Sequence, residues 1–191
     1  MKEKFINELK NNHMIAAVKN IENLDAALES NCKIVFLLSG SIFNLKQIVE
    51  KVKDKNKMIF IHVDLLDGFS KDATALKYIC EEICPDGIIS TKNNILKTAK
   101  AMGFLTVQRV FIIDSLSIET AVKSAQMISP DAIEILPGIM PKITKKISET
   151  SEIPVIVGGL IREKEEVADA IENGALGVST TLQTIWGNNN D

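Results

Sequence analysis

Eight short apolar runs, each followed by a segment of helical periodicity, constrain this chain more than any other feature. The runs span residues 14–20, 33–40, 57–66, 86–91, 105–114, 131–138, 153–159 and 175–181. Between them, apolar residues return every three or four positions, as in helices that pack one face on a sheet. Runs that are apolar almost throughout are typical of parallel strands covered by helices, because a sheet with one wet face would alternate. The pattern therefore predicts repeated β–α units.

Eight units of about 24 residues each predict an α/β fold, a single (β/α)8 barrel of the TIM type that is compact beside the usual length of about 250 residues. An open, doubly wound parallel sheet is the alternative. We expect one domain over residues 1–191, with residues 1–12 as an N-terminal extension and residues 187–191 as a frayed tail.

Composition limits the partners and the compartment. A net charge of −3 and a pI near 5.5 give no overall field that attracts nucleic acid, so RNA binding would need a local basic patch. The three cysteines are odd in number and lack metal-ligand spacing, so we expect neither disulfides nor a metal site. Without a signal peptide or a long apolar run, we expect no membrane partner and a cytoplasmic location. Nothing in the sequence sets the oligomeric state.

Two motifs at the ends of the last two runs predict a phosphate site. The seventh run ends in Gly158 and Gly159, and the eighth ends in Ser179, Thr180 and Thr181. In barrels of this type, the loops after strands seven and eight commonly hold phosphate. Glycine lets main-chain N–H groups approach an anion closely, and the hydroxyls add further donors. Either motif alone is also an ordinary turn or cap, and it is the pairing that favours a phosphate site.

Polar residues near the carboxyl ends of the other runs complete a predicted pocket, since charges within apolar strands should be paired or bound to ligand. They are Lys19, His62, Asp64, Thr91, Arg109 and Glu134, and Gly138, at the end of the sixth run, is expected in the same pocket. Glu134 alternates with Ile133 and Ile135, which puts its carboxylate inside the barrel. It either binds ligand or forms a core ion pair with Arg109 or Lys19. His62 is either a core histidine or a pocket donor.

Several long strings give the chain a family resemblance. They read HVDLLDGFSKDATAL, DGIISTKNNILKTAKAMGFLTVQRVFIIDS, DAIEILPGIMPK, IPVIVGGLI and GALGVSTTLQTIW. In this order they resemble the glycerol-3-phosphate responsive antiterminator family, from about Met14 to Trp186. The resemblance implies a (β/α)8-like fold that binds glycerol 3-phosphate and, in that state, contacts leader mRNA to prevent premature termination of transcription of glycerol-use genes.

The resemblance carries two departures and no RNA-binding surface. Asn20 follows Lys19 where the family tends to have aspartate, and Ser41 follows Gly40 where it also tends to have aspartate, which puts ligand specificity in question. For RNA, Lys142, Lys145 and Lys146 are candidate contacts, although a solvated helix face explains the same run. No cofactor is expected besides the ligand.

An enzyme is the alternative function. The run HVDLLDG, which begins at His62, also resembles the histidine-aspartate-aspartate run of ribulose-phosphate epimerases, where these residues hold a metal and move protons. Such an epimerase needs a second histidine near another strand end, but the other histidine of this chain, His13, precedes the first run. We therefore expect a regulatory protein and not a phosphosugar epimerase, isomerase or aldolase.

Overall fold

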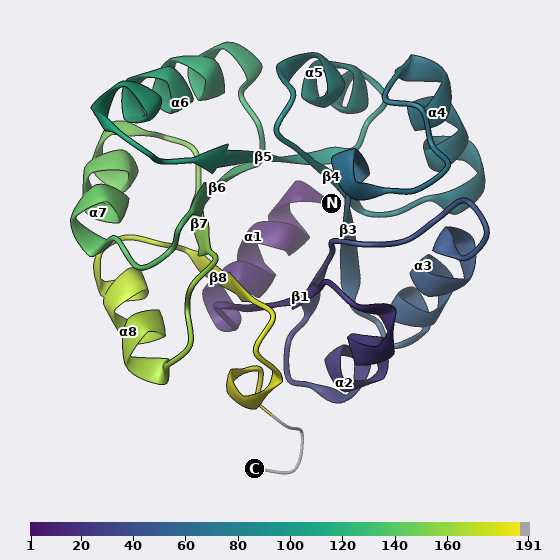
Figure 1. Cartoon of the computed structure of the whole chain (residues 1–191), viewed down its shortest axis with the longest axis horizontal. Coiled ribbons are helices and arrows are strands. Elements are labelled where there is room, and N and C mark those ends of the chain that lie inside the picture. The colour runs from purple at the N-terminus through teal and green to yellow at the C-terminus, as the bar shows by residue number, and fades with distance from the viewer. Residues whose placement is uncertain (188–191) are drawn as a thin grey trace.

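Eight parallel strands close into a barrel in residues 1–187, the part of the chain that this computed structural model describes (Figure 1). The strands are β1 (Met14–Val18), β2 (Ile34–Leu37), β3 (Met58–His62), β4 (Gly87–Ser90), β5 (Leu105–Phe111), β6 (Ala132–Leu136), β7 (Val155–Gly158) and β8 (Gly177–Thr180). Each strand pairs with its neighbours in sequence, and β8 pairs with β1 to close the ring. The predicted barrel is confirmed, and the open sheet is excluded.

Helices α2 to α8 surround the barrel (Figure 1). They are α2 (Leu24–Glu29), α3 (Leu45–Asp54), α4 (Ala73–Tyr78), α5 (Asn93–Ala101), α6 (Ser115–Ile128), α7 (Pro141–Thr150) and α8 (Lys164–Glu172). Short 3-10 turns follow three strands, η1 (Ile21–Asn23), η2 (Val63–Leu65) and η4 (Gln183–Ile185), while η3 (Ile79–Ile83) continues α4 as a π-helical turn. None of the helices within residues 1–187 is both long and apolar enough to cross a membrane.

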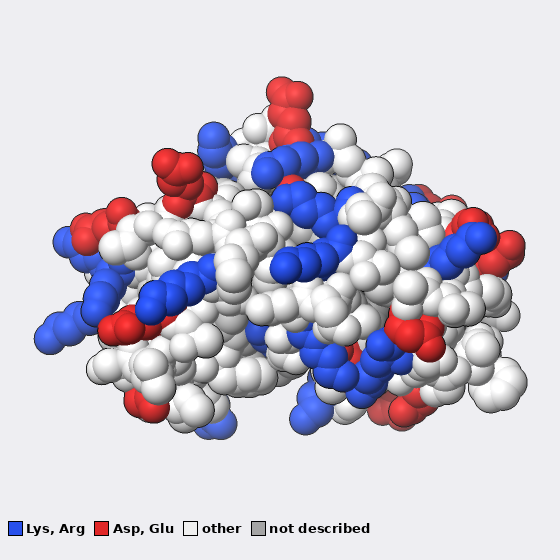
Figure 2. Space-filling model, turned by 90° about the horizontal axis from the view of Figure 1, so that it is seen from above, with Lys and Arg blue, Asp and Glu red and all other residues white. Residues whose placement is uncertain are grey.

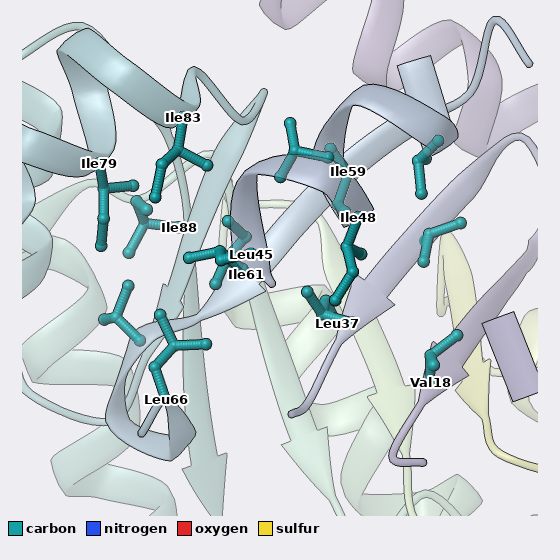
Figure 3. Close-up of a cluster of buried hydrophobic side chains, with 14 of the residues drawn as sticks. Val18, Leu37, Leu45, Ile48, Ile59, Ile61, Leu66, Ile79, Ile83 and Ile88 are labelled. Atoms are coloured by element: carbon teal, nitrogen blue, oxygen red, sulfur yellow. The ribbon is translucent and has the colours of Figure 1, made fainter. Parts of the chain in front are cut away.

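Two apolar layers hold the fold together. The outer layer lies between strands and helices, where Ile48 of α3 packs with Leu37 and Ile61 of neighbouring strands (Figure 3). The inner layer fills the barrel with side chains of alternate strand residues, including Phe36 and Phe60, whose ring centroids lie 5.6 Å apart. This alternation is what the near-continuous apolar runs require, because both faces of every strand are buried.

Residues 1–12, expected as an extension, contain a helix that closes the barrel floor. Helix α1 (Lys2–Asn11) lies across the middle of the ring (Figure 1). Its Phe5 and Leu9 are fully buried with the inward-facing side chains, and Phe5 stacks on Phe60 with centroids 4.6 Å apart. Since Leu9 contacts Gly177, the first residue of β8, α1 covers the amino-terminal end of the strands. The barrel is therefore open to ligands at its carboxyl end.

The predicted frayed tail lies mostly outside the described residues. Its first residue, Gly187, has a main-chain carbonyl that accepts a hydrogen bond from the N–H of Asn31 at 3.1 Å. Just before it, the buried Trp186 donates from its ring nitrogen to the carbonyl of Thr180 at 2.8 Å. The chain is thus anchored as far as residue 187, and residues 188–191 lie beyond the described part.

Candidate functional site

The two predicted phosphate motifs lie side by side at the carboxyl end of the barrel. Gly158 and Ser179 are register partners in the β7–β8 pair. After Gly158 the chain turns through two left-handed residues, Gly159 with φ +75° and Leu160 with φ +64°. Glycine adopts this conformation without strain, whereas leucine does so at a cost. The geometry turns the main chain sharply at the mouth of the barrel.

The hydroxyl groups of β8 are engaged within the protein. Ser179 Oγ donates to Glu134 Oε1 at 2.6 Å, and Thr180 Oγ1 donates to the carbonyl of Ile161 at 3.2 Å while accepting from the N–H of Leu182 at 3.1 Å. These hydroxyl groups therefore hold the loops in place. An anion bound here would be contacted mainly by main-chain N–H groups.

Some main-chain N–H groups at the same place are unpaired among the described residues. Within residues 1–187, no hydrogen bond involves the N–H of Gly159, Leu160 or Thr181. Groups of this kind are strong donors that need water or a ligand when they are not paired. Three unpaired donors on two neighbouring loops can converge on one oxyanion.

A cavity of about 590 Å³, which we call the ligand cavity, opens beside these N–H groups. It is lined by Ala17, Leu38, Arg109, Glu134, Leu136, Gly159, Leu160, Ile161, Arg162, Ser179, Thr180, Thr181 and Leu182. Arg162, which the sequence reasoning missed, is exposed and adds a second cation to the lining. Its only sequence signal is a basic residue three positions after the glycine pair.

Arg109 and Glu134 form a buried ion pair inside the barrel. Arg109 Nε donates to Glu134 Oε2 at 2.6 Å, and the two side chains are 7% and 0% exposed. The inward direction of Glu134 and the core pair with Arg109 are thus confirmed, while Lys19 is exposed and lies elsewhere. Because the ion pair also lines the cavity, the carboxylate can accept a ligand hydroxyl and the guanidinium can donate to one.

Gly158 is required by this buried network. A Cβ atom at Gly158 would lie 2.3 Å from Ser179 Oγ and 2.9 Å from Glu134 Oε1. A side chain would therefore displace the hydrogen bond between these two groups. The first glycine of the pair makes room for the Glu134 carboxylate, and the second makes the turn.

His62 ends β3 and Asp64 lies within η2, and neither residue lines the ligand cavity. Asp64 Oδ2 accepts from Ser90 Oγ at 2.9 Å and from the N–H and hydroxyl of Thr91 at 2.8 and 3.2 Å. His62 Nδ1 is 3.8 Å from the same Oδ2. Asp64 thus ties the loop after β3 to the start of the loop after β4.

Burial, followed by the positive charge of Arg109, lowers the pKa of His62 from 6.5 to about 4. The unfolded chain takes up this proton below about pH 6.5 and the folded chain only near pH 4, so stability falls as the pH falls through this window. We expect about 2 kcal/mol of unfolding free energy to be lost from this group between pH 7.5 and 5. Urea denaturation over that range measures it. His62→Gln should show a flatter profile, and equal slopes for both proteins would contradict the assignment.

The remaining predicted residues lie outside the ligand cavity. Lys19 lines a separate hollow of about 560 Å³ together with Asn20 and Ser41, the two departures from the family pattern. Thr91 contacts Asp64, as described above. Gly138 donates from its N–H to the carbonyl of Gly159 at 2.9 Å, which supports the turn after β7. The pocket predicted as one site is therefore divided, with Arg109 and Glu134 in the ligand cavity.

The lysines proposed for RNA lie on one helix. Lys142, Lys145 and Lys146 are exposed on α7, near its amino-terminal half. The buried Thr144 and Ile147 of α7 face the barrel. The three cations are thus available on the outside of the fold.

Comparison with known proteins gives the family. A model described as glycerol-3-phosphate responsive antiterminator matches residues 14–186. This chain belongs to that antiterminator family. Over 178 residues the chain is 41% identical to the uncharacterized protein YgcP of Escherichia coli (strain K12), and the match covers 93% of each protein. The predicted resemblance is confirmed.

Solved structures of antiterminator proteins share the fold. The glycerol uptake operon antiterminator regulatory protein from Listeria monocytogenes str. 4b F2365 matches with a TM-score of 0.88 at 38% identity, covering 92% of this chain and 95% of that one. A glycerol uptake operon antiterminator-related protein from Thermotoga maritima MSB8 matches with a TM-score of 0.81 at 28% identity, covering 92% and 98%. An N-acetylmannosamine-6-phosphate 2-epimerase from Clostridium perfringens, at 14% identity and a TM-score of 0.70 over 92% and 88%, shares the fold alone.

Proposed function

We propose that this antiterminator-family protein binds glycerol 3-phosphate in the ligand cavity and that the liganded form contacts leader mRNA in the cytoplasm, preventing premature termination of transcription of glycerol-use genes. Ligand binding is supported by the unpaired N–H groups of Gly159, Leu160 and Thr181, which lie beside a cavity lined by two arginines. The family membership supports the RNA half.

Charge and hydrogen-bond donors support a phosphate position in the ligand cavity. Arg109 and Arg162 carry two positive charges to the cavity lining and Glu134 one negative charge, which leaves a net positive site for an anion. Charge-assisted hydrogen bonds from main-chain N–H groups contribute about 1.5 to 3 kcal/mol each. The phosphate is therefore the main anchor of the ligand.

The buried ion pair supports a position for the polyol part of the ligand. Each Glu134 oxygen already accepts one hydrogen bond, and a carboxylate oxygen can accept a second from a ligand hydroxyl. Apolar neighbours such as Ala17 and Leu136 line the rest of this region. Hydroxyl contacts of this kind separate a phosphorylated polyol from inorganic phosphate.

A phosphosugar enzyme remains the weaker candidate. The residues that suggested it are dispersed, because His62 and Asp64 lie outside the ligand cavity while Asp67 lines the hollow around Lys19. His62 is also buried, and its Nδ1 has no hydrogen-bond partner among the described residues. We therefore propose a ligand-responsive regulator without catalytic residues.

The decisive experiment combines ligand and RNA binding on the wild-type protein. Glycerol 3-phosphate at 100 times its Kd should stabilise the fold by about 2.7 kcal/mol, seen as a concentration-dependent rise in Tm, whereas glycerol should have little effect. A gel shift with the chain's own leader transcript should appear with glycerol 3-phosphate and weaken without it. If glycerol 3-phosphate does not raise the Tm, the proposed ligand binding is wrong. If no gel shift appears at low salt, the proposed RNA binding is wrong.

Gly159→Ala tests the phosphate placement. Alanine at φ +75° is strained, and its Cβ would lie 3.3 Å from Leu136 Cδ2, so the turn and its N–H groups must move. We expect glycerol 3-phosphate to bind roughly 10- to 100-fold more weakly, the equivalent of about one charge-assisted bond. Isothermal titration calorimetry measures this.

Gly103→Ala is the matched control for this substitution. Gly103 has φ +87°, and a Cβ there meets no atom within 4 Å. It therefore brings similar backbone strain at a place far from the ligand cavity, after α5. Equal losses of ligand affinity in the two variants would show that strain, and not the N–H groups of the turn, sets the affinity.

A further inference from the structure

A second open groove lies between α5 and α6, next to the ligand cavity. We call it the α5–α6 groove; it has a volume of about 800 Å³. Its lining comes from the start of α5, the end of β5 and the start of α6, and includes Lys92, Asn93, Gln108, Arg109 and Phe111. The ligand proposed above does not use this groove.

The segment from β4 to the end of β5, which borders the groove, carries basic residues and no acidic ones. Residues 87–113 contain Lys92, Lys97, Lys100 and Arg109 and no aspartate or glutamate. Lys92 and Lys97 are exposed, whereas Lys100 donates to the carbonyls of Ile128 and Ser129 at the far end of α5. On the side of the molecule seen in Figure 2, basic side chains gather near the middle and acidic ones lie mostly toward the edges. Such a surface attracts a polyanion although the chain as a whole is acidic.

The acidic residue in the groove lining is engaged locally. Asp114 precedes α6, and its Oδ1 accepts the N–H of Ser117 at 2.7 Å. Its charge is thus offset by the first turn of the helix. Lys92, which precedes α5, lines the groove, and Lys97 is exposed farther along this helix.

The groove also offers an aromatic face and a buried acceptor. Phe111 is 58% exposed, and Ile113 and Leu116 beside it are 88% and 69% exposed. At the floor, the 2% exposed Gln108 donates to Ser124 Oγ at 2.6 Å, but its Oε1 has no hydrogen-bond partner among the described residues. A nucleobase supplies both a face that stacks on phenylalanine and N–H groups that satisfy a buried acceptor.

Arg109 connects this groove to the ligand cavity. Of the residues described, it is the one that lines both. Its Nε donates to Glu134 Oε2, and its side chain is only 7% exposed, so its position is fixed. A ligand that contacts Arg109 on one side therefore fixes the wall of the groove on the other.

We propose that the α5–α6 groove receives a nucleotide of single-stranded leader RNA, with its base on Phe111 and neighbouring phosphates on Lys92 and Lys97, and that Arg109 couples this contact to the ligand cavity. The proposal rests on the proposed function. Coupling through one side chain is reciprocal, so RNA should raise the affinity for glycerol 3-phosphate by the same factor by which the ligand raises RNA affinity.

The test measures RNA binding by each variant through the fluorescence anisotropy of a labelled leader transcript. The measurements are made with saturating glycerol 3-phosphate at several salt concentrations. Lys92→Ala/Lys97→Ala should weaken binding and lower the slope of log K against log salt by about 1.4. Phe111→Ala should weaken binding roughly 5- to 150-fold, as loss of one stacked base does. Both variants should bind glycerol 3-phosphate like wild type when RNA is absent.

Two comparison proteins make the result specific. Lys4→Ala/Lys10→Ala removes two exposed charges from α1, at the opposite end of the barrel, and should leave RNA binding unchanged. Lys142→Ala/Lys145→Ala/Lys146→Ala tests α7 as the competing surface. If only the α7 variant loses RNA affinity, while the Lys92/Lys97 and Phe111 variants bind RNA like wild type, the α5–α6 groove is not the RNA site. The proposed function would still stand. If the wild-type protein binds no leader RNA, both the groove proposal and the RNA part of the proposed function are wrong.

Discussion

Replacing Glu134 with alanine should lower the free energy of unfolding by about 3 to 5 kcal/mol, because it leaves the guanidinium of Arg109 buried without its partner. The same change removes the acceptor of the Ser179 hydroxyl, which is also buried. Urea denaturation measures the loss through the midpoint. Binding of glycerol 3-phosphate should disappear as well, since Glu134 lines the ligand cavity.

A double variant separates stability from binding in this experiment. Arg109→Met/Glu134→Leu replaces the ion pair by apolar side chains, which for buried pairs is often neutral or stabilising. We expect it to recover most of the stability lost in Glu134→Ala and none of the ligand affinity. A double variant that binds glycerol 3-phosphate normally would show that the ion pair takes no part in the ligand site.

Replacing Phe5 with alanine should cost about 3 to 5 kcal/mol of unfolding free energy, the usual loss for a large aromatic side chain removed from a core. Phe5 is fully buried, and its ring stacks on Phe60 at the barrel floor. The measurement is again the urea midpoint, with the slope of the transition unchanged because the barrel still unfolds as a whole.

The neighbouring Lys4→Ala is the control for the floor helix. Lys4 is exposed on the same α1, and a surface change of this kind usually stays within about 0.5 kcal/mol. A loss below about 1 kcal/mol for Phe5→Ala would mean that α1 packs only loosely on the barrel. Glycerol 3-phosphate affinity should be unchanged in both variants, since the ligand cavity lies at the other end of the strands.

The order of strands was predictable because both faces of each strand are buried, but strand ends were not. The run expected at residues 57–66 yields a strand that ends at His62, and the run at 105–114 yields one that ends at Phe111. Apolar character alone extended these runs, since Leu65 and Ile113 are apolar yet 48% and 88% exposed. Hydrophobicity in a sequence does not distinguish a buried strand residue from an exposed apolar residue in a loop.

Parts of the site were also readable from the sequence. The inward direction of Glu134 followed from alternation, and its partner follows from register, because Arg109 and Glu134 are directly paired across β5 and β6. What remained hidden was how the loops divide the space above the barrel. Lys19 and Arg109 both lie near strand ends, so the sequence predicts one pocket for both. Lys19 instead lines a hollow that is separate from the ligand cavity. Loop paths depend on contacts between segments that no periodicity records.

Helix α1 also bears on how the chain is made. Leu9 packs against Gly177, and the ring of His13 contacts the carbonyl of Leu176 at 2.9 Å, so α1 settles against a strand that is synthesised much later. Until β8 is made, Leu9 lacks part of the surface that covers it. Closure of the barrel floor therefore waits for β8, and a nascent chain arrested before residue 177 exposes apolar residues of α1 that chaperones can recognise.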